Sequence, residues 1–200
     1  MHRPTPLDTP WERAGSPTQD QQTAYDLITK AMNAAVARYH NLSDLGRSIT
    51  VRYDPSVPTA DGSNNGTIRF GSNRSHMTER TALHEIAHTI GVGTGAHWKS
   101  LSSGGTWHGA QATALVKRFD GSGATLSTGG GHVWPYGLNY ENEFSNMAAD
   151  RQDRGRSPER ERHGRGQWSK PMCTWSWWVL SLKNWLAVPP PDNRTGPPTL

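Results

Sequence analysis

Apolar side chains recur at two different spacings in the first half of the sequence, and each spacing predicts a type of element. Between Gln22 and Leu42 they return every three or four residues, which is typical of an amphipathic helix that covers a sheet. Polar and apolar positions alternate over Ser48–Tyr53 and again over Thr67–Gly71, which predicts two short, half-buried strands. A helix followed by strands indicates an α+β fold.

A second helix is expected to begin at Thr78. Threonine is a suitable N-cap, and Glu79 would lie in the first turn, where the helix dipole favours a negative charge. The helix runs to about Ile90 and ends at Gly91. The other expected features are turns over residues 61–66, a helix from about Trp107 to Phe119, glycine-rich loops over residues 121–131, an aromatic turn over residues 132–140 and a short helix over residues 142–149.

The helix that begins at Thr78 contains the motif HExxH, formed by His84, Glu85 and His88. At roughly 100° per residue, the two histidines lie about 40° apart on one face and one turn apart in height. Both imidazoles can therefore reach one metal ion. The apolar residues that cluster on the opposite side of the same helix are Ala82, Leu83, Ile86 and Ile90.

Zinc suits two neutral imidazoles on one helix face, since it binds ring nitrogens at about 2.0–2.1 Å. A catalytic zinc site needs three protein ligands and an open position, and the metal lowers the pKa of a water there to about 7. Glu85 is next to the first histidine, where it can accept that proton and pass it to the leaving amine. We therefore expect zinc at His84 and His88, with Glu85 as the general base.

The motif continues as HExxHxxG, from His84 to Gly91, and so resembles the metzincin branch of the zinc metallopeptidases. In that branch a third histidine follows three residues after the glycine, whereas this sequence has Thr94 there. Together with the segment HVWPYGLNYENE, the motif is similar to a group of secreted bacterial zincin-like proteins, some of which carry a ricin-type lectin module. The resemblance covers about residues 20–148 and includes the stretch TADGSNNGTIRFGSNRS.

Two histidines are candidates for the third zinc ligand. His97 follows a glycine-rich turn after the helix, whereas His132 would return to the helix through the tertiary structure. In the similar group, the histidine before an aromatic-Pro-Tyr-Gly run is the steadier feature, so the resemblance implies His132. Glu141 and Glu143 are further candidates for a carboxylate ligand, but they lack the second-helix pattern that accompanies such a ligand.

Three more residues near the expected site are candidates for a role in it. Tyr136 and Tyr140 follow His132 and could stabilise an oxyanion through their hydroxyls, or they could be aromatic core residues. Metzincins place a methionine beneath the metal, and Met147 is the only methionine between the motif helix and residue 151.

Residues 151–170 differ sharply from the preceding chain in charge. They carry 7 basic and 3 acidic side chains, whereas residues 1–150 carry 12 and 13 and are nearly neutral. Residues 168–185 hold five of the nine tryptophans. The tail could be a basic arm for nucleic acid or an anionic membrane, a solvated disordered segment, or a C-terminus translated out of frame after about Asp150, which we favour. Because the folded part is nearly neutral, we expect no nucleic-acid partner.

Composition excludes several other classes of protein. The single cysteine, Cys173, rules out an intramolecular disulfide and a multi-thiolate metal site. No run of about 18 apolar residues is present, so no transmembrane segment is expected. The N-terminal residues lack the apolar stretch of a secretory signal, whereas the resemblance implies a secreted protein.

These observations predict an α+β, zincin-like metallopeptidase domain with a small sheet and an HExxH active-site helix. The domain covers residues 21–150, between a disordered lead-in (1–20) and a basic, Trp- and Pro-rich tail (151–200). The expected function is a zinc metalloendopeptidase that hydrolyses peptide bonds with a metal-activated water. We expect a monomer that acts on protein or peptide substrates. The alternative is a catalytically degenerate domain of the same fold with a binding or structural role, such as association with carbohydrate.

Overall fold

The computed structural model describes residues 11–42, 45–141 and 143 of the 200-residue chain. These residues form two four-stranded sheets and helices of both α and 3-10 type, so the α+β class predicted from the sequence is confirmed. In chain order the elements are β1 (Trp11–Glu12), α1 (Gln19–Leu42), β2 (Thr50–Tyr53), β3 (Ala60–Gly62), β4 (Thr67–Phe70), η1 (Arg74–His76), α2 (Glu79–Thr89), α3 (Ala96–Leu101), β5 (Ser102–Ser103), β6 (Thr106–Trp107), α4 (Ala110–Asp120), β7 (Ser127–Gly129) and β8 (His132–Trp134).

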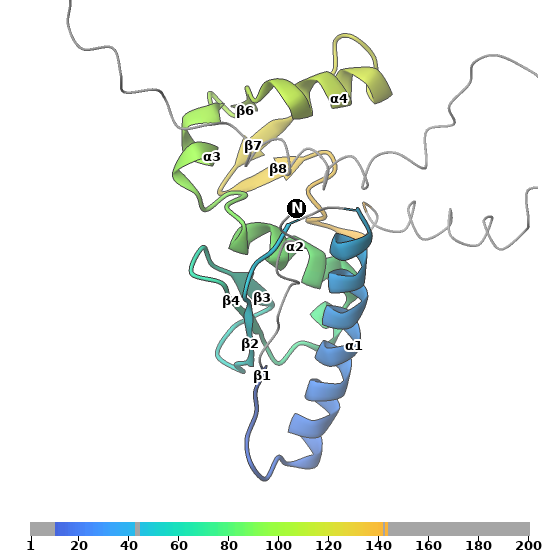
Figure 1. Ribbon diagram of the computed structural model, residues 1–200, viewed down its shortest axis with the longest axis vertical. Coiled ribbons are helices and arrows are strands. Elements are labelled where there is room, and N and C mark those ends of the chain that lie inside the picture. Colours follow the sequence, from blue (N-terminus) through green and yellow to red (C-terminus); the bar gives the residue numbers. More distant parts are fainter. Residues whose placement is uncertain (1–10, 43–44, 142, 144–200) are drawn as a thin grey trace, which may run out of the picture.

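The first sheet has the strand order β1-β2-β4-β3 (Figure 1). Strands β1, β2 and β4 are parallel, whereas the edge strand β3 runs antiparallel to β4. The predicted strands over Ser48–Tyr53 and Thr67–Gly71 are confirmed as β2 and β4. Strand β3 lies where the sequence predicts turns, because a three-residue strand of Ala, Asp and Gly carries no alternation of polar and apolar positions.

Charged side chains cross the solvent-facing side of this sheet in one row. The strand register places Glu12 beside Arg52, Arg52 beside Arg69, and Arg69 beside Asp61. Each arginine forms an ion pair with the acidic residue on the adjacent outer strand, at 2.7 Å for Arg52–Glu12 and 2.5 Å for Arg69–Asp61. The two arginines lie side by side on the inner strands; Arg52 pairs with Glu12, and Arg69 pairs with both Asp61 and Asp54.

Helices α1 and α2 cover the other, apolar side of the sheet and pack on each other. The predicted helix over residues 22–42 is confirmed and begins about one turn earlier, at Gln19. The hydroxyl of Tyr39 donates a hydrogen bond to the backbone oxygen of Leu83 at 3.2 Å, and Arg38 forms an ion pair with Glu79 at 2.7 Å. The largest fully buried side chains of this core are Ile28, Met32, Tyr39, Ile49, Val51, Ile68, Phe70, Leu83, Ile86 and Thr89.

Helix α2 begins and ends at signals that are visible in the sequence. The hydroxyl of Thr78 accepts a hydrogen bond from the backbone N–H of Thr81, as expected of an N-cap, and Glu79 lies in the first turn. After the C-terminus, Gly91 has φ of 104°, a conformation that glycine adopts at much lower cost than other residues. The predicted boundaries of this helix are therefore confirmed.

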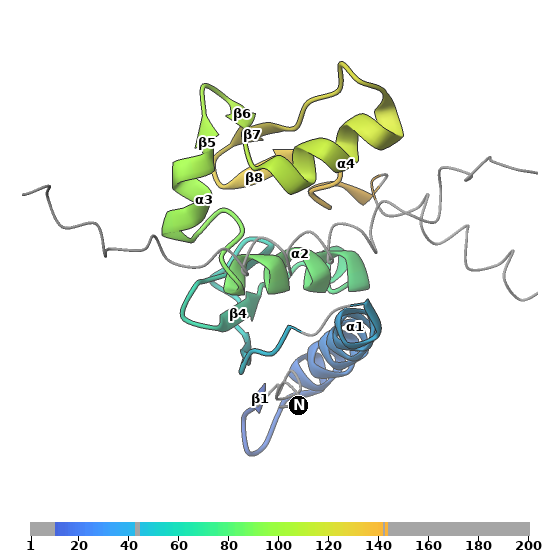
Figure 2. The ribbon, with the colours of Figure 1, turned by 45° about the horizontal axis from the view of Figure 1, so that its top comes forward.

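The second sheet is antiparallel in the order β5-β6-β7-β8, and with α3 and α4 it lies on the opposite side of α2 from the first sheet (Figure 2). Its core contains Trp98 of α3 and Trp107 of β6, whose buried rings stack with centroids 4.5 Å apart. Val116, Leu126 and Val133 are also buried here. Helix α2 consequently lies between the two halves of the fold.

The second half of the fold differs most from the sequence prediction. The helix expected from Trp107 to Phe119 begins only at Ala110, because Trp107 pairs with Ser102 across β5 and β6. The sequence does not predict α3 or strands β5–β8. Strands of two or three residues are too short to show a period, and the glycine-rich stretches around them are typical of loops.

The described part of the N-terminal segment is more structured than the sequence suggests. Strand β1 pairs with β2, and its Trp11 ring lies edge-on against Tyr25 of α1, with centroids 6.0 Å apart. The short helix expected over residues 142–149 is not described beyond residue 143, and the tail over residues 151–200 lies outside the described residues. Among the helices that the structure describes, none is long and apolar enough to cross a membrane.

Gly62 allows β3 to lie directly against α2, and replacing it should destabilise the protein. A Cβ atom at position 62 would overlap the backbone oxygen of Glu85, whereas a Cβ at Gly15 would meet nothing within 4 Å. We expect Gly62→Ala to lower the free energy of unfolding by about 2 kcal/mol, as overpacking does. Gly15→Ala should change it by less than about 1 kcal/mol. Urea denaturation followed by circular dichroism measures both, and equal midpoints for the two variants would contradict the close packing.

Candidate metal centre

The two histidines of the HExxH motif project from one side of α2, as the sequence predicts. His84 and His88 are both half-buried, and their ring centroids lie 4.6 Å apart. The opposite side of the helix is anchored in the core, where Ala82, Leu83 and Ile86 are fully buried. Packing of the apolar side therefore fixes the direction in which the two imidazoles point.

His132, the first residue of β8, brings a third imidazole to the same place. Its ring stacks on that of His84 at a centroid distance of 5.2 Å and lies edge-on to that of His88 at 5.4 Å. One ring nitrogen from each of the three residues lies within 4.8 Å of the others. Two histidines from one helix and one from a distant strand thus form a cluster that could hold a metal ion.

Backbone carbonyls orient the two histidines of the helix. The Nδ1 atom of His84 lies 2.7 Å from the oxygen of Gly137, and Nδ1 of His88 lies 2.8 Å from the oxygen of Val92. Because a carbonyl oxygen only accepts, each Nδ1 must carry the proton and donate it. In a neutral ring, this leaves Nε2 with a free lone pair, which is the tautomer that metal ligation requires.

Both of these rings are held neutral by their surroundings. Burial, followed by the charge of neighbouring His88, lowers the pKa of His84 to about 3. Burial also lowers the pKa of His88, although its hydrogen bond to Val92 acts in the opposite direction. Neither ring therefore carries a second proton near neutral pH.

The two free Nε2 atoms face each other at a distance of 3.1 Å. With both Nδ1 protons donated to carbonyls and both rings neutral, no hydrogen lies between them, so two lone pairs are in close contact. Two nitrogen ligands of a tetrahedral zinc ion, each about 2.0–2.1 Å from the metal, lie roughly 3.3 Å apart. The residues present therefore fit a cation that is shared by the two rings, with His132 as the third ligand.

Glu85 lies between the two histidines in sequence but is not part of the histidine cluster. Its side chain is buried, and the backbone N–H of Gly62 in β3 interacts with its carboxylate. Burial, followed by the negative charge of Asp61, raises the pKa of Glu85 to about 8, while the Arg80 guanidinium and the Gly62 N–H act in the opposite direction. Glu85 thus lies in a dry environment at the edge of the first sheet.

A backbone contact between two glycine-rich turns positions His132. Gly93 follows α2 with φ of 73°, and Gly131 precedes His132 with φ of 85°. A Cβ atom at position 93 would overlap the oxygen of Gly131, and one at position 131 would lie 3.2 Å from the oxygen of Gly93. Only residues without a side chain allow the two turns to approach this closely.

The structure separates the two candidates for the third ligand. His97 lies on α3 with an exposed side chain, and in the described part of the chain the cluster consists of His84, His88 and His132 alone. Thr94, at the position where metzincins have a histidine, donates its hydroxyl to the backbone oxygen of His88 at 2.7 Å. It helps to hold the turn after the helix.

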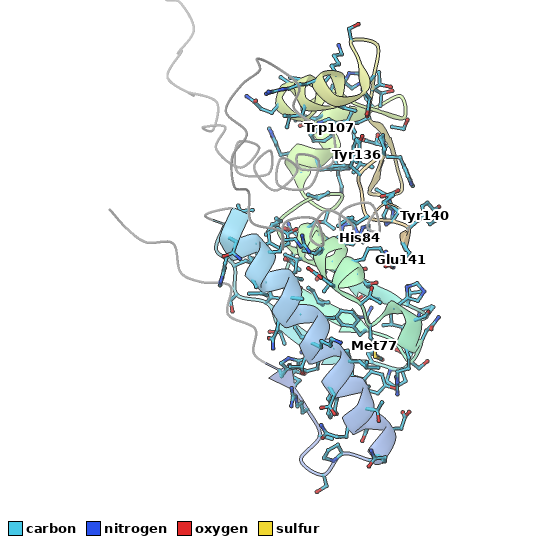
Figure 3. The ribbon with its side chains drawn as sticks, turned by 90° about the vertical axis from the view of Figure 1, so that its right-hand side faces the viewer. Met77, His84, Trp107, Tyr136, Tyr140 and Glu141 are labelled. Atoms are coloured by element: carbon cyan, nitrogen blue, oxygen red, sulfur yellow. The ribbon has the colours of Figure 1, made fainter. Side chains whose placement is uncertain are left out.

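The other residues singled out from the sequence lie around the cluster without joining it. Tyr136 donates its hydroxyl to the carboxylate of Asp120, at 3.0 and 2.8 Å to the two oxygens, while Tyr140 is exposed (Figure 3). Glu141 pairs with Arg80, and Glu143 accepts a hydrogen bond from the Asn139 backbone. Neither glutamate belongs to the cluster, and Met147 lies outside the described residues.

Sequence reasoning does not identify Gly137 or Arg80 as residues of this site. Gly137 acts through its carbonyl, for which no residue type gives a signal. Arg80 precedes His84 by four residues and therefore lies one turn away on the same side of α2, a spacing that could have marked it.

Comparison with known proteins adds no relative: no family model, no curated protein and no solved structure matches the chain. The fold and the site therefore define the protein as an α+β protein with three histidines that could hold a metal ion. His84 and His88 lie on α2 with the spacing of an HxxxH helix.

Removing each candidate histidine should show which one is the third ligand. We expect the purified protein to bind one zinc ion, and His132→Ala to weaken that binding by roughly tenfold or more, because an open ligand position replaces a ring nitrogen. His97→Ala should leave the affinity unchanged. Competition with a chromophoric chelator measures both values. Loss of binding in the His97 variant alone would reverse the assignment.

The contact between the glycine turns can be tested with two glycines that share a left-handed backbone. Gly93→Ala and Gly104→Ala both place a side chain at positive φ, at 73° and 57°, but only the first one meets another backbone. Both variants should lose about 1 kcal/mol of stability from the strained conformation, and Gly93→Ala should lose more because its Cβ overlaps the backbone oxygen of Gly131. Only Gly93→Ala should also weaken zinc binding, because the turn before His132 must move away. Equal zinc affinities of the two variants would show that this contact does not position the ligand.

Proposed function

We propose that this protein is a zinc-dependent metallopeptidase that hydrolyses peptide bonds. The observation that carries the proposal is the cluster of His84, His88 and His132, in which the Nε2 atoms of the first two lie 3.1 Å apart. The second support is Glu85, the residue that follows the first histidine in the HExxH motif. The resemblance to secreted zincin-like proteins points the same way and implies that the protein acts outside the cell.

His84, His88 and His132 would hold the zinc ion, and three protein ligands are the number that a catalytic zinc site uses. A zinc ion bound there supplies Lewis acidity and lowers the pKa of a water. Gly137 and Val92 orient the two helix histidines through their carbonyls. The role of Glu85 follows from its place in the motif. Its pKa is raised to about 8 by burial, and a cation held by the histidines would favour its ionised form. In that form Glu85 would accept a proton from the attacking water and later give it to the leaving amine.

A peptide substrate fits the edge of the first sheet. Strand β3 is the outermost strand of that sheet in the described residues, and its Gly62 lies against α2 at Glu85. An extended peptide can add to such an edge through main-chain hydrogen bonds. A peptide bound along β3 would therefore pass the residue proposed as the general base.

A second candidate function is a metal-binding domain without catalytic activity, which could serve in binding or structure. It is favoured by one observation, that Glu85 interacts with the Gly62 N–H and is not part of the histidine cluster. Both candidates bind zinc, so metal content does not separate them. Turnover of a peptide substrate does.

Replacing the proposed general base should abolish hydrolysis without removing the metal. We expect Glu85→Gln to lower kcat by about 100-fold or more, because an amide cannot accept the proton, while the bound zinc is retained. Glu12→Gln is the control, since Glu12 is an exposed carboxylate on β1 that pairs with Arg52. Hydrolysis of casein and of a fluorogenic peptide library, with zinc content measured in parallel, gives both values.

Two results would decide against the peptidase. One is full activity of Glu85→Gln with zinc still bound, which would remove Glu85 from the reaction. The other is a wild-type protein that binds zinc in a folded state but cleaves neither casein nor any library peptide, which would favour the non-catalytic domain. A chelator should abolish true activity, and added zinc should restore it.

A further inference from the structure

Arg80 is a buried cation, and most of its hydrogen bonds go to the segment that follows His132. The side chain lies on α2, four residues before His84, and the residue is only 7% exposed. A buried arginine requires hydrogen-bond partners for its guanidinium, because an uncompensated charge in the interior is costly. The identity of these partners therefore shows what this residue does.

The guanidinium of Arg80 forms hydrogen bonds with three residues of the segment that follows β8. Its Nη1 donates to the backbone oxygens of Leu138 at 2.7 Å and Asn139 at 3.3 Å, and its Nε donates to the carboxylate of Glu141 at 3.0 Å. Nη2 donates to the hydroxyl of the neighbouring Thr81 at 2.9 Å. Figure 3 shows Glu141 beside the helix that carries His84.

The backbone that Arg80 holds is in an unfavourable conformation. Tyr136 and Leu138 have φ of 77° and 58°, which residues other than glycine rarely adopt. Between them lies Gly137, whose oxygen accepts the Nδ1 proton of His84. Such a conformation persists only where surrounding contacts fix it, and the shortest bond from Arg80 ends on the oxygen of Leu138 itself.

We propose that Arg80 is a positioning residue for the metal site: it fastens residues 132–141 to α2, so that His132 and the Gly137 carbonyl stay in place. Arg80 bonds Thr81 and residues of the segment after β8, and it acts through them on two of the three histidines. Through the segment it sets His132, and through Gly137 it sets the ring of His84. The inference rests on the metal site of the proposed function but does not require peptidase activity.

Three variants test this role. Arg80→Met keeps the length of the side chain but removes every donor, Arg80→Lys keeps the charge without the planar fork, and Arg38→Met is the control. Arg38 is also partly buried, and its hydrogen bonds to Glu79, one residue before Arg80, join α1 to the first turn of α2. Its loss should therefore loosen α1 from α2 and leave the ligand segment in place.

The measurements are zinc affinity by chelator competition, the visible spectrum of the cobalt-substituted protein, and amide hydrogen exchange of the metal-free protein. We expect Arg80→Met to weaken zinc binding roughly 10- to 100-fold, as loss of a supporting residue around a metal ligand does. Its cobalt bands should weaken as tetrahedral coordination is lost, and exchange should accelerate over residues 132–141. Arg80→Lys should lie between Arg80→Met and wild type, and Arg38→Met should match wild type in all three measurements.

A double variant shows whether the effect passes through His132. In the His132→Ala background, Arg80→Met should weaken zinc binding clearly less than it does in the wild-type background, because one of the two ligands it positions is gone. An equal loss in both backgrounds would overturn the proposal. So would unchanged exchange over residues 132–141, or an equal loss of zinc affinity in Arg38→Met.

Two further experiments test the role of Arg80 if Arg80→Met does not fold or if the wild-type protein binds no metal. If Arg80→Met does not fold, Glu141→Gln removes the charged partner at a side chain that is 65% exposed, and it should weaken zinc binding in the same direction but less. Wild-type zinc affinity in this variant, together with wild-type affinity in Arg80→Lys, would overturn the role. If the wild-type protein binds neither zinc nor cobalt, the proposed function is refuted. Amide hydrogen exchange over residues 132–141 of the metal-free protein would then still show whether Arg80 holds this segment.

Discussion

The arrangement of the whole site depends on how α2 divides its surface between the core and the histidine cluster. One side of the helix is buried against α1 and the first sheet, where Leu83 and Ile86 have no exposure. Because this packing fixes the rotation of the helix about its axis, the residues one turn apart on the other side, Arg80, His84 and His88, face the second half of the fold. A different rotation would expose Leu83 and would separate the histidines from His132.

The part of the site that lies on α2 could be predicted from the sequence, because helix geometry alone relates residues four positions apart. Thr78 and Gly91 mark the two ends of the helix, and the spacing of His84 and His88 places both rings on one side. The third histidine of the cluster could not be derived in this way. His132 reaches the cluster through a contact between two turns of irregular backbone, for which no periodic pattern exists, and the sequence led to it only through the resemblance.

The first sheet and α1 can also be predicted from the sequence, whereas the second sheet cannot. Strands β2 and β4 have four residues each and alternate clearly, so their buried positions, such as Val51 and Ile68, can be recognised. Strands β5–β8 have two or three residues each, which is too short for an alternation to be recognised in the sequence, and the core beside them contains the stacked pair Trp98 and Trp107. Tertiary packing, which a local pattern does not contain, determines the structure there.

The contact between Gly93 and Gly131 also restricts how this site can vary in evolution. Main-chain atoms meet main-chain atoms, so a side chain at position 93 would require the backbone at Gly131 to move, and one at position 131 would require a smaller shift of Gly93. Both glycines also have positive φ, which is a second and independent constraint. Sequences that share this architecture should therefore keep the pattern HExxHxxGxG and, after a spacer of variable length, the pair Gly-His. That combined signature is more restrictive than HExxH alone and could find relatives that similarity over the whole chain does not reveal.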